Sequence, residues 1–403
     1  MTTASTPSDL ARGQKAADPL QLIDVDHVRF YVGNAKQAAH FYASTFGFTL
    51  DQIADLTTGS REEANYVLTQ GNIRFILTSG LTKDHAASKE VMLYGDGVKD
   101  VAFTVFDAEK AWERAVANGA EPAYEPAISK DEKGSVTKAG IKTYGRVIHS
   151  FVSRSGQYEL ANVKKGGVMS PAFRKVKPGE YGLNDSNREH PCGLKFVDHL
   201  VGNVELGKMN HWVAWYENVL EFKLFKHFDD KDISTEFSAL MSKVMSSGNN
   251  LIKMPINEPA HGKKKSQVQE YLDWHDDVPG VQHLALRTDD ELASISELRR
   301  RGVDFLTIPE AYYDKVWERV EKTLKHHGHD TVKEDHDRVR DLGILVDADD
   351  EGYLLQLFTK PLQDRPTLFF EIICRRGSQS FGKGNFKALF EALEMEQERR
   401  GNL

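Results

Sequence analysis

The chain has 403 residues, 40% hydrophobic and 28% charged, which is the balance of a soluble globular protein with two domains of ordinary size. Its formal net charge of −8 provides no broad positive field and excludes nucleic acid or anionic lipid as an expected partner. The two cysteines, Cys192 and Cys374, offer no disulfide framework, and no apolar stretch is long enough to span a bilayer, so we expect a cytoplasmic protein.

Residues 1–18 are rich in Thr, Ser, Ala and Pro and lack an apolar core, which predicts a disordered lead-in rather than a signal peptide. The sequence that follows is duplicated. The tripeptide Val-Asp-His at 25–27 recurs at 197–199, and in both copies it opens an apolar strand followed by a helix with an aromatic pair and a return strand. Charged amphipathic helices are predicted later in each copy, over 108–119 and 290–302.

This repetition predicts an α+β fold made of paired βαβββ modules. Because one such module cannot bury its sheet face alone, two modules should curl together into an open barrel that can hold a small ligand. We place one domain at 19–163, a linker rich in Gly, Pro, Lys and Asn at 164–190, and a second domain at 191–380. Residues 381–403 should form a helix, from 386 to 399, that closes over a site as a lid.

Three polar residues stand in strands that are otherwise apolar: His199, His283 and Glu371. A carboxylate in so apolar a strand should be paired or bound to metal, because desolvating its charge costs several kcal/mol. Two imidazoles and one carboxylate are the ligands of the facial triad, which leaves three positions of an octahedral metal open. Each residue alone is more often an ordinary core or edge residue, but the duplication gives the two histidines equivalent places in paired modules.

The first copy has His27 where the second has His199, Asp100 where it has His283, and Glu159 roughly where it has Glu371. These residues could hold a hard cation, although a decayed duplicate that serves packing is the favoured interpretation. The charged segment 308–341 contains a histidine cluster at 326–329, which we interpret as a surface insertion rather than a metal site.

Buried amides also need partners, and three occur near the second-copy triad: Gln282, Gln356 and Asn257, the last in a Pro-Ile-Asn-Glu-Pro segment that predicts a rigid turn. Satisfaction within the protein is the favoured interpretation of any one of them, and a substrate is the alternative.

With these motifs in view, the chain resembles the 4-hydroxyphenylpyruvate dioxygenases from about residue 19 to the C-terminus. The resemblance is most specific in the second half, in the strings PINEP at 255–259, KSQ at 265–267, VQH at 281–283, QLFTKP at 356–361, FFEII at 369–373 and FGKGNF at 381–386. It implies two vicinal-oxygen-chelate domains, similar to glyoxalase and bleomycin-resistance proteins, with catalysis confined to the second.

The family resemblance further implies one Fe(II) per subunit, bound by His199, His283 and Glu371. It implies that 4-hydroxyphenylpyruvate and O₂ become homogentisate and CO₂, and that the protein is a homodimer or homotetramer. Substrate residues implied in the same way are Ser242, Asn257, Gln267, Gln282, Gln356, Phe358, Phe369, Phe381 and Phe386. Among these, Phe358 and Phe386 would sandwich the aromatic ring, and Phe369 and Phe381 would complete the apolar wall.

Two alternatives remain open. A 4-hydroxymandelate synthase shares fold, metal and substrate but hydroxylates the benzylic carbon; Asn257 and the Phe381/Phe386 tail favour ring chemistry instead. A metal-free protein that binds an aromatic ligand would make the triad a coincidence. An extradiol dioxygenase is disfavoured because its ligands lie closer together in the sequence.

Overall fold

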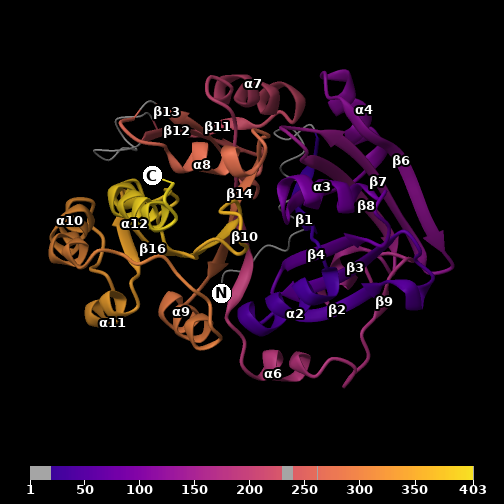
Figure 1. Cartoon of the computed structure of the whole chain (residues 1–403), viewed down its shortest axis with the longest axis horizontal. Helices are drawn as coiled ribbons and strands as arrows, with labels where there is room; N and C mark the ends of the chain where they lie inside the picture. Colours follow the sequence, from indigo (N-terminus) through magenta and orange to yellow (C-terminus); the bar gives the residue numbers. More distant parts are fainter. Residues whose placement is uncertain (1–19, 229–238, 261, 403) are drawn as a thin grey trace, which may run out of the picture.

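The computed structural model describes residues 20–228, 239–260 and 262–402, and within them two strongly curved sheets lie side by side (Figure 1). The lead-in predicted at 1–18 lies outside the described residues. No helix in the described ranges is both long and apolar enough to cross a membrane.

The first sheet has the strand order β6-β7-β8-β5-β1-β4-β3-β2-β9. Its strands are β1 (Leu22–Tyr31), β2 (Thr49–Ala54), β3 (Glu63–Gln70), β4 (Ile73–Gly80), β5 (Gly97–Val105), β6 (Pro122–Asp131), β7 (Gly134–Lys142), β8 (Ile148–Gly156) and β9 (Arg174–Lys175). Its helices are α2 (Ala35–Phe46), η1 (Leu56–Thr58), α3 (Ala86–Tyr94), α4 (Ala108–Ala117), α5 (Leu160–Lys164) and α6 (Leu183–Glu189).

The second sheet has the order β11-β12-β13-β10-β14-β17-β16-β15. Its strands are β10 (Leu194–Asn203), β11 (Lys223–Phe228), β12 (Ala239–Ser246), β13 (Lys253–Ala260), β14 (Gly280–Thr288), β15 (Leu345–Ala348), β16 (Tyr353–Phe358) and β17 (Phe369–Arg376). Its helices are α7 (Met209–Val219), α8 (Gln267–Trp274), α9 (Glu291–Arg300), η2 (Glu310–Tyr312), α10 (Tyr313–His326), α11 (His336–Asp341), η3 (Lys383–Asn385) and α12 (Phe386–Arg399).

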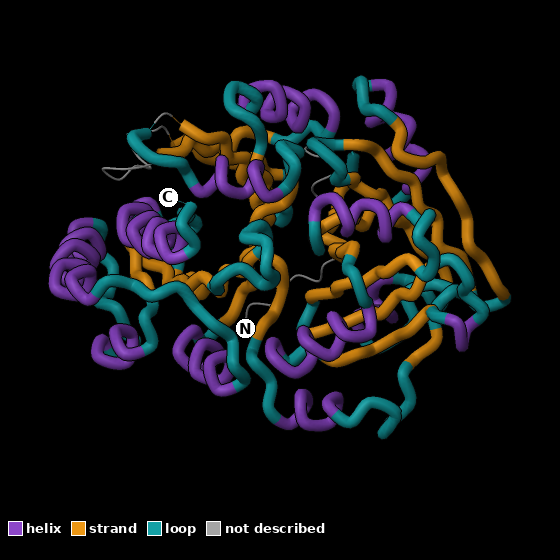
Figure 2. Tube along the Cα trace, in the orientation of Figure 1, coloured by secondary structure: helices purple, strands orange, loops and turns teal. Residues whose placement is uncertain are grey.

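The predicted duplication is confirmed strand by strand. In the first sheet β1 pairs in parallel with β4 and antiparallel with β5, and β5 pairs in parallel with β8. In the second sheet β10, β13, β14 and β17 repeat these three pairings. Each half therefore curls around one concave face (Figure 2).

The predicted amphipathic helices are confirmed as α4 and α9. Each begins after an aspartate, Asp107 or Asp290, whose carboxylate accepts a hydrogen bond from a backbone N–H of the first turn. Each ends before the glycine that the sequence suggested as its limit, because that glycine lies beyond the cap, at positive φ (Gly119 and Gly302). The C-terminal helix has the predicted bounds, Phe386–Arg399.

The segment expected to be a plain linker, 164–190, is fastened to the first half. Its strand β9 pairs with β2, and Asn184 exchanges hydrogen bonds with the backbone of Leu50. The Asn187 amide donates to the carbonyls of Ala43 and Phe48. Gly and Pro content predicted the irregular path, but these side-chain-to-backbone bonds carry no local sequence signal.

The charged segment 308–341 also has more structure than a solvated insertion. It forms η2, α10 and α11, and α10 buries Val316, Val320 and Leu324 at a helical spacing. The segment is therefore anchored to the protein by an apolar stripe, although its outer face is charged. His326, His327 and His329 are exposed, and they form no metal-binding group with any described residue.

One hydrophobic core joins the two halves. Phe370 of β17 is fully buried and packs against three aromatic rings of the first half, those of Tyr42, Phe46 and Phe75. The shortest of these contacts, to Phe46, has 5.1 Å between ring centroids in an edge-to-face arrangement. The strand that carries Glu371 is thus held in place by the first half.

Candidate metal centre

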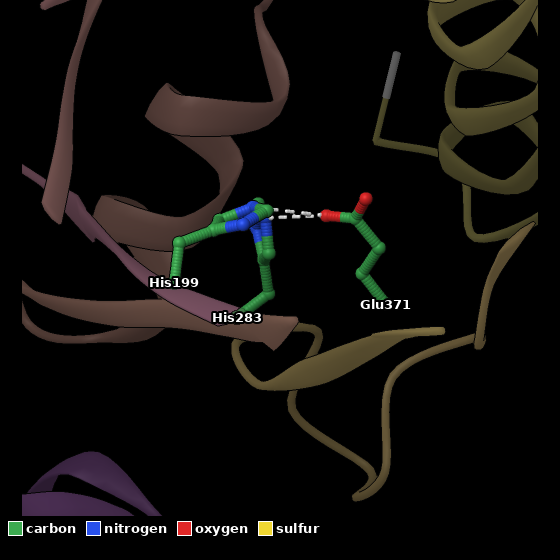
Figure 3. A group of neighbouring side chains, drawn as sticks. All are labelled: His199, His283 and Glu371. Atoms are coloured by element: carbon green, nitrogen blue, oxygen red, sulfur yellow. Dashed lines mark ion pairs between the residues drawn. The ribbon is translucent and has the colours of Figure 1, made fainter. Parts of the chain in front are cut away.

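The three residues predicted as ligands converge on the concave face of the second sheet. β10 carries His199, its neighbour β14 carries His283, and β17 on the far side of β14 carries Glu371. The Glu371 Oε2 lies 3.1 Å from His199 Nε2 and 3.6 Å from His283 Nε2. Figure 3 shows both imidazoles directed at this one carboxylate oxygen.

Hydrogen bonds on the far side of each ring fix this orientation. The Nδ1 of His199 lies 2.8 Å from Asp198 Oδ1, and the Nδ1 of His283 lies 3.0 Å from Gln282 Oε1. With Nδ1 donating to these oxygens, Nε2 keeps its lone pair for a metal. Asp198 is itself held by a buried ion pair with Arg375, at 2.7 Å.

Electrostatics keep the carboxylate charged. Burial disfavours the charge of Glu371, but the His199 charge and the Nε2 contacts of both histidines outweigh it and lower the pKa of this carboxyl to about 2. Burial likewise lowers the pKa of His283. For His199 the neighbouring carboxylates of Glu371 and Asp198 overcome burial and raise the pKa.

The chemistry of this donor set fits a divalent transition metal. One atom from each of the three residues lies within 4.8 Å of the other two, and no other group of this kind occurs in the described parts of the chain. Imidazole nitrogen and carboxylate oxygen without thiolate suit iron or a similar ion better than a structural zinc. A charged carboxylate that is 3% exposed is stabilised further by a bound cation of this kind.

A mostly apolar pocket of about 80 Å³ opens beside the three residues. Eight residues predicted to bind substrate line its wall: Ser242, Asn257, Gln267, Gln282, Phe358, Phe369, Phe381 and Phe386. Eight further residues line the pocket but were not predicted from the sequence to be site residues: Val201, Phe228, Leu240, Val244, Pro255, Leu389, Phe390 and Leu393. For Leu389, Phe390 and Leu393 the one sequence signal was the apolar stripe of α12, because a helix that closes over a site presents its apolar stripe to that site.

The aromatic rings are arranged mainly around the imidazoles. Phe369 stacks on His283 with centroids 4.8 Å apart, and Phe358 meets the same imidazole edge to face at 6.0 Å. Phe381 approaches His199 edge to face at 4.9 Å. Phe386 contacts Phe228, at 5.2 Å. The rings therefore limit imidazole movement as well as lining the pocket.

Two predicted residues occupy places that differ from expectation. Gln356 is buried beneath the turn at Gly382, off the pocket wall, and neither of its amide atoms has a hydrogen-bond partner. Asn257 lies within β13 and not in a turn, so that prediction was wrong. Proline has no backbone N–H to donate to a neighbouring strand. The prolines at 255 and 259 are tolerated because their nitrogens face β10, which pairs with β13 only at Gly202 and Asn203.

Gln267 starts α8, after the N-cap Ser266. Its Oε1 is buried without a partner although the residue lines the pocket. An unpaired buried acceptor on a pocket wall is a polar group that a ligand can satisfy.

The strand registers of the first half correct one sequence-based equivalence. Asp100 faces Ile148 in β8 as His283 faces Phe369 in β17, which places Ser150 where Glu371 stands. Glu159 is exposed at the start of α5 and was wrongly aligned with Glu371. It forms no metal-binding group with His27 and Asp100, so among described residues the first half has lost this ligand.

Comparisons with known proteins agree with this fold and site. Residues 24–134 and 197–357 match the model of the Glyoxalase/Bleomycin resistance protein/Dioxygenase superfamily. A triple mutant of 4-hydroxymandelate synthase from Streptomyces coelicolor superposes with a TM-score of 0.77 at 27% identity, covering 93% of this chain and 98% of that one. Paired curled sheets with one His-His-Glu group therefore define the class as this superfamily.

Similarity over nearly the whole length is more specific. The 4-hydroxyphenylpyruvate dioxygenase of Tetrahymena thermophila is 48% identical, across 95% of this chain and 92% of the relative. The protein of the same name from Danio rerio is 44% identical, across 95% and 93%. The chain belongs to the 4-hydroxyphenylpyruvate dioxygenase family.

Proposed function

We propose that this protein is an Fe(II)-dependent dioxygenase that converts 4-hydroxyphenylpyruvate and O₂ to homogentisate and CO₂. The observation that carries the proposal is the convergence of His199, His283 and Glu371 at the base of an apolar pocket. A ferrous ion held by these three residues would supply open coordination positions for a 2-oxo acid and O₂, together with the redox chemistry that O₂ activation needs.

The protein's own residues then bind and orient the substrate. Phe358, Phe369 and Phe381 provide an apolar wall for an aromatic ring. The amides of Gln267 and Asn257 and the hydroxyl of Ser242 are polar groups on the same wall, available to the substrate's phenol or carboxylate. α12 covers the pocket with Leu389, Phe390 and Leu393, which excludes water from the reacting centre.

A matched pair of variants tests the metal site. His199→Ala should abolish stoichiometric iron binding and oxygen uptake with 4-hydroxyphenylpyruvate. His27→Ala, which removes the equivalent histidine of the first half, should leave both unchanged. Iron bound equally by the His199 variant, or oxygen uptake without iron, would refute the proposed site.

Product analysis separates the proposed reaction from that of the structural relative in Streptomyces coelicolor. Chromatography after incubation with 4-hydroxyphenylpyruvate should yield homogentisate, because relatives that are 44% and 48% identical over 95% of this chain carry the 4-hydroxyphenylpyruvate dioxygenase name. A 4-hydroxymandelate peak would contradict the proposal and assign benzylic hydroxylation.

Cellular location and assembly belong to the same proposal. Both cysteines are buried and free, which suits a reducing compartment, and we infer a cytoplasmic enzyme. We infer further that it assembles as a homodimer or homotetramer, which light scattering of the purified protein will test.

A further inference from the structure

The concave face of the first sheet encloses a second cavity, of about 410 Å³. His27 and Asp100 line it, and these are the register equivalents of His199 and His283. The cavity is thus the first-half counterpart of the metal-site pocket. The first sheet is the one on the right of Figure 1. This cavity is also the larger of the two, and the reaction proposed above makes no use of it.

Its polar groups do not suit a divalent metal. Asp100 Oδ2 lies 2.5 Å from the hydroxyl of Ser150, the residue that replaces Glu371, and Asp100 Oδ1 accepts the Ser150 backbone N–H at 3.0 Å. His27 has the same Nδ1 contact, to Asp26 at 2.6 Å, as His199 has to Asp198, but its imidazole would be the one ligand left to a metal in this group. The carboxylate is therefore satisfied within the protein, and the ligand of this cavity must belong to a different chemical class.

One cation of the cavity wall has no counter-charge. Arg29 pairs with Glu63 at 2.8 Å, and Lys99 pairs with Glu90 at 2.9 Å. Arg154, which lies behind the wall, pairs with Asp26 through Nη2 at 2.8 Å. The ammonium group of Lys138 makes no hydrogen bond or ion pair with any residue in the described ranges, although Lys138 lines the cavity.

The surroundings of Lys138 disfavour the positive charge of its ammonium group. Burial, followed by the charges of Arg154 and Arg29, lowers the pKa of Lys138 to about 8, against the weaker opposite effects of Asp26 and Asp100. An unpaired ammonium beside two guanidinium groups is costly unless an anion joins it. In the second half Gln356, a neutral residue, occupies the equivalent register position.

Part of the remaining wall is apolar, between polar residues such as Asn65, Ser129 and Ser170. Ile76, Val136, Ile148 and Phe173 contribute side chains to it, and Tyr124 adds an aromatic ring. A bare inorganic anion would leave these surfaces in contact with water, whereas an organic carboxylate can cover them. We propose that the first-half cavity binds a small organic carboxylate with an apolar body, whose anionic group pairs with Lys138.

Calorimetric titration of the full-length, metal-free protein with 4-hydroxyphenylacetate at pH 8 tests this proposal. Lys138→Met should weaken one binding event about ten-fold or more, as expected for loss of a hydrogen bond to a charged group. Lys142→Met, which removes an exposed lysine from the same strand, should leave binding unchanged. Lys138→Gln, which copies the second-half residue, provides a second variant if the methionine variant does not fold.

Proton uptake gives a readout that a merely structural lysine would not change. The bound carboxylate should raise the pKa of Lys138, so binding at pH 8 should take up about half a proton, measured in buffers of different ionisation enthalpy. Equal affinity and equal proton uptake in wild type and both Lys138 variants would overturn the proposal. Inorganic phosphate binding as tightly as 4-hydroxyphenylacetate, with the same Lys138 dependence, would overturn the requirement for an apolar body.

Discussion

Asp198 and Asp26 show how one buried residue can orient a histidine in both halves. Each aspartate bonds the Nδ1 of the histidine that follows it and pairs with a buried arginine, Arg375 or Arg154. In both cases burial opposes the charge, yet the arginine and histidine hold the pKa of the aspartate well below its usual value. The orienting device has thus survived in the half that lost a metal ligand.

This symmetry provides a matched test of orientation against stability. Asp198→Asn and Asp26→Asn should each destabilise the protein by about 3 kcal/mol, because each leaves a buried arginine without its counter-charge. Only Asp198→Asn should weaken iron binding, by about 10- to 100-fold, as is usual when a partner of a metal-binding histidine is lost. Urea denaturation and metal titration measure the two effects. Equal loss of iron affinity in both variants would show that stability alone is responsible.

At the residue scale, the sequence predicted the triad because charged and polar groups stood out against apolar strands. It could not predict the role of Ser150, because serine is unremarkable in a strand and only the register of β5 with β8 reveals its equivalence to Glu371. Lys138 was missed for a similar reason: a lysine among Gly, Ser and Thr residues in β7 is unremarkable, and only the folded sheet shows that it lines a cavity.

At the scale of elements, the end of α12 is joined to α8 by a partly buried ionic contact. Glu270 of α8 is 4% exposed, and its carboxylate accepts hydrogen bonds from Arg400 at 2.8 Å and from Asn402 at 2.9 Å. The same helix α8 begins with Gln267, which lines the pocket. The contact therefore couples the closed position of the C-terminal helix to a wall of the site.

Removing this contact should loosen α12 selectively. Arg400→Met leaves Glu270 partly unsatisfied, at a cost of about 1–3 kcal/mol, and should accelerate amide hydrogen exchange in residues 386–399 by about ten-fold. Arg399→Met removes a neighbouring arginine that is paired with Glu396 at the surface, and should leave exchange close to wild type. Uniform acceleration across the second sheet in the Arg400 variant would instead indicate global destabilisation.

Apolar periodicity and capping residues predicted the positions of the elements, and both end residues of α12 were predicted correctly. The helices of 308–341 were predicted less well, because their many charges masked an apolar stripe of three residues in α10. The proline-flanked Asn257 misled for a different reason. Proline indicates a turn when a segment is considered alone. In the folded protein a strand tolerates these prolines because β10 pairs with only a short part of β13.

At the scale of the whole molecule, a buried histidine bridges the two halves. His149 of β8 is fully buried, with Nε2 lying 2.8 Å from the Tyr216 hydroxyl of α7 and Nδ1 lying 3.0 Å from the Val101 carbonyl. Burial, partly opposed by the bond to Val101, lowers the pKa of His149 to about 4. The folded protein therefore keeps this imidazole neutral over a range in which an unfolded chain protonates it.

The sign of the resulting pH dependence follows directly. His149 contributes its full stabilisation above pH 6.5, and about 3 kcal/mol should be lost as pH falls from 6.5 to 4, since the unfolded state binds the extra proton. Urea denaturation between pH 7 and pH 5 should show this decline, and His149→Gln should make it shallower. His211→Gln, at an exposed histidine, should keep the wild-type slope. A slope unaffected by His149→Gln would contradict the assignment.

The contact of Phe370 with the first-half aromatic rings limits how far a homologue of this protein can be shortened. Adjacent strand residues point to opposite faces, so Phe370 faces the companion half while Glu371 faces the metal site. A homologue that lacked the first 190 residues would expose this phenylalanine to solvent, on the face of β17 opposite to Glu371. Shortened, self-sufficient forms should therefore be rare among relatives, and any that exist should carry a polar residue at this position.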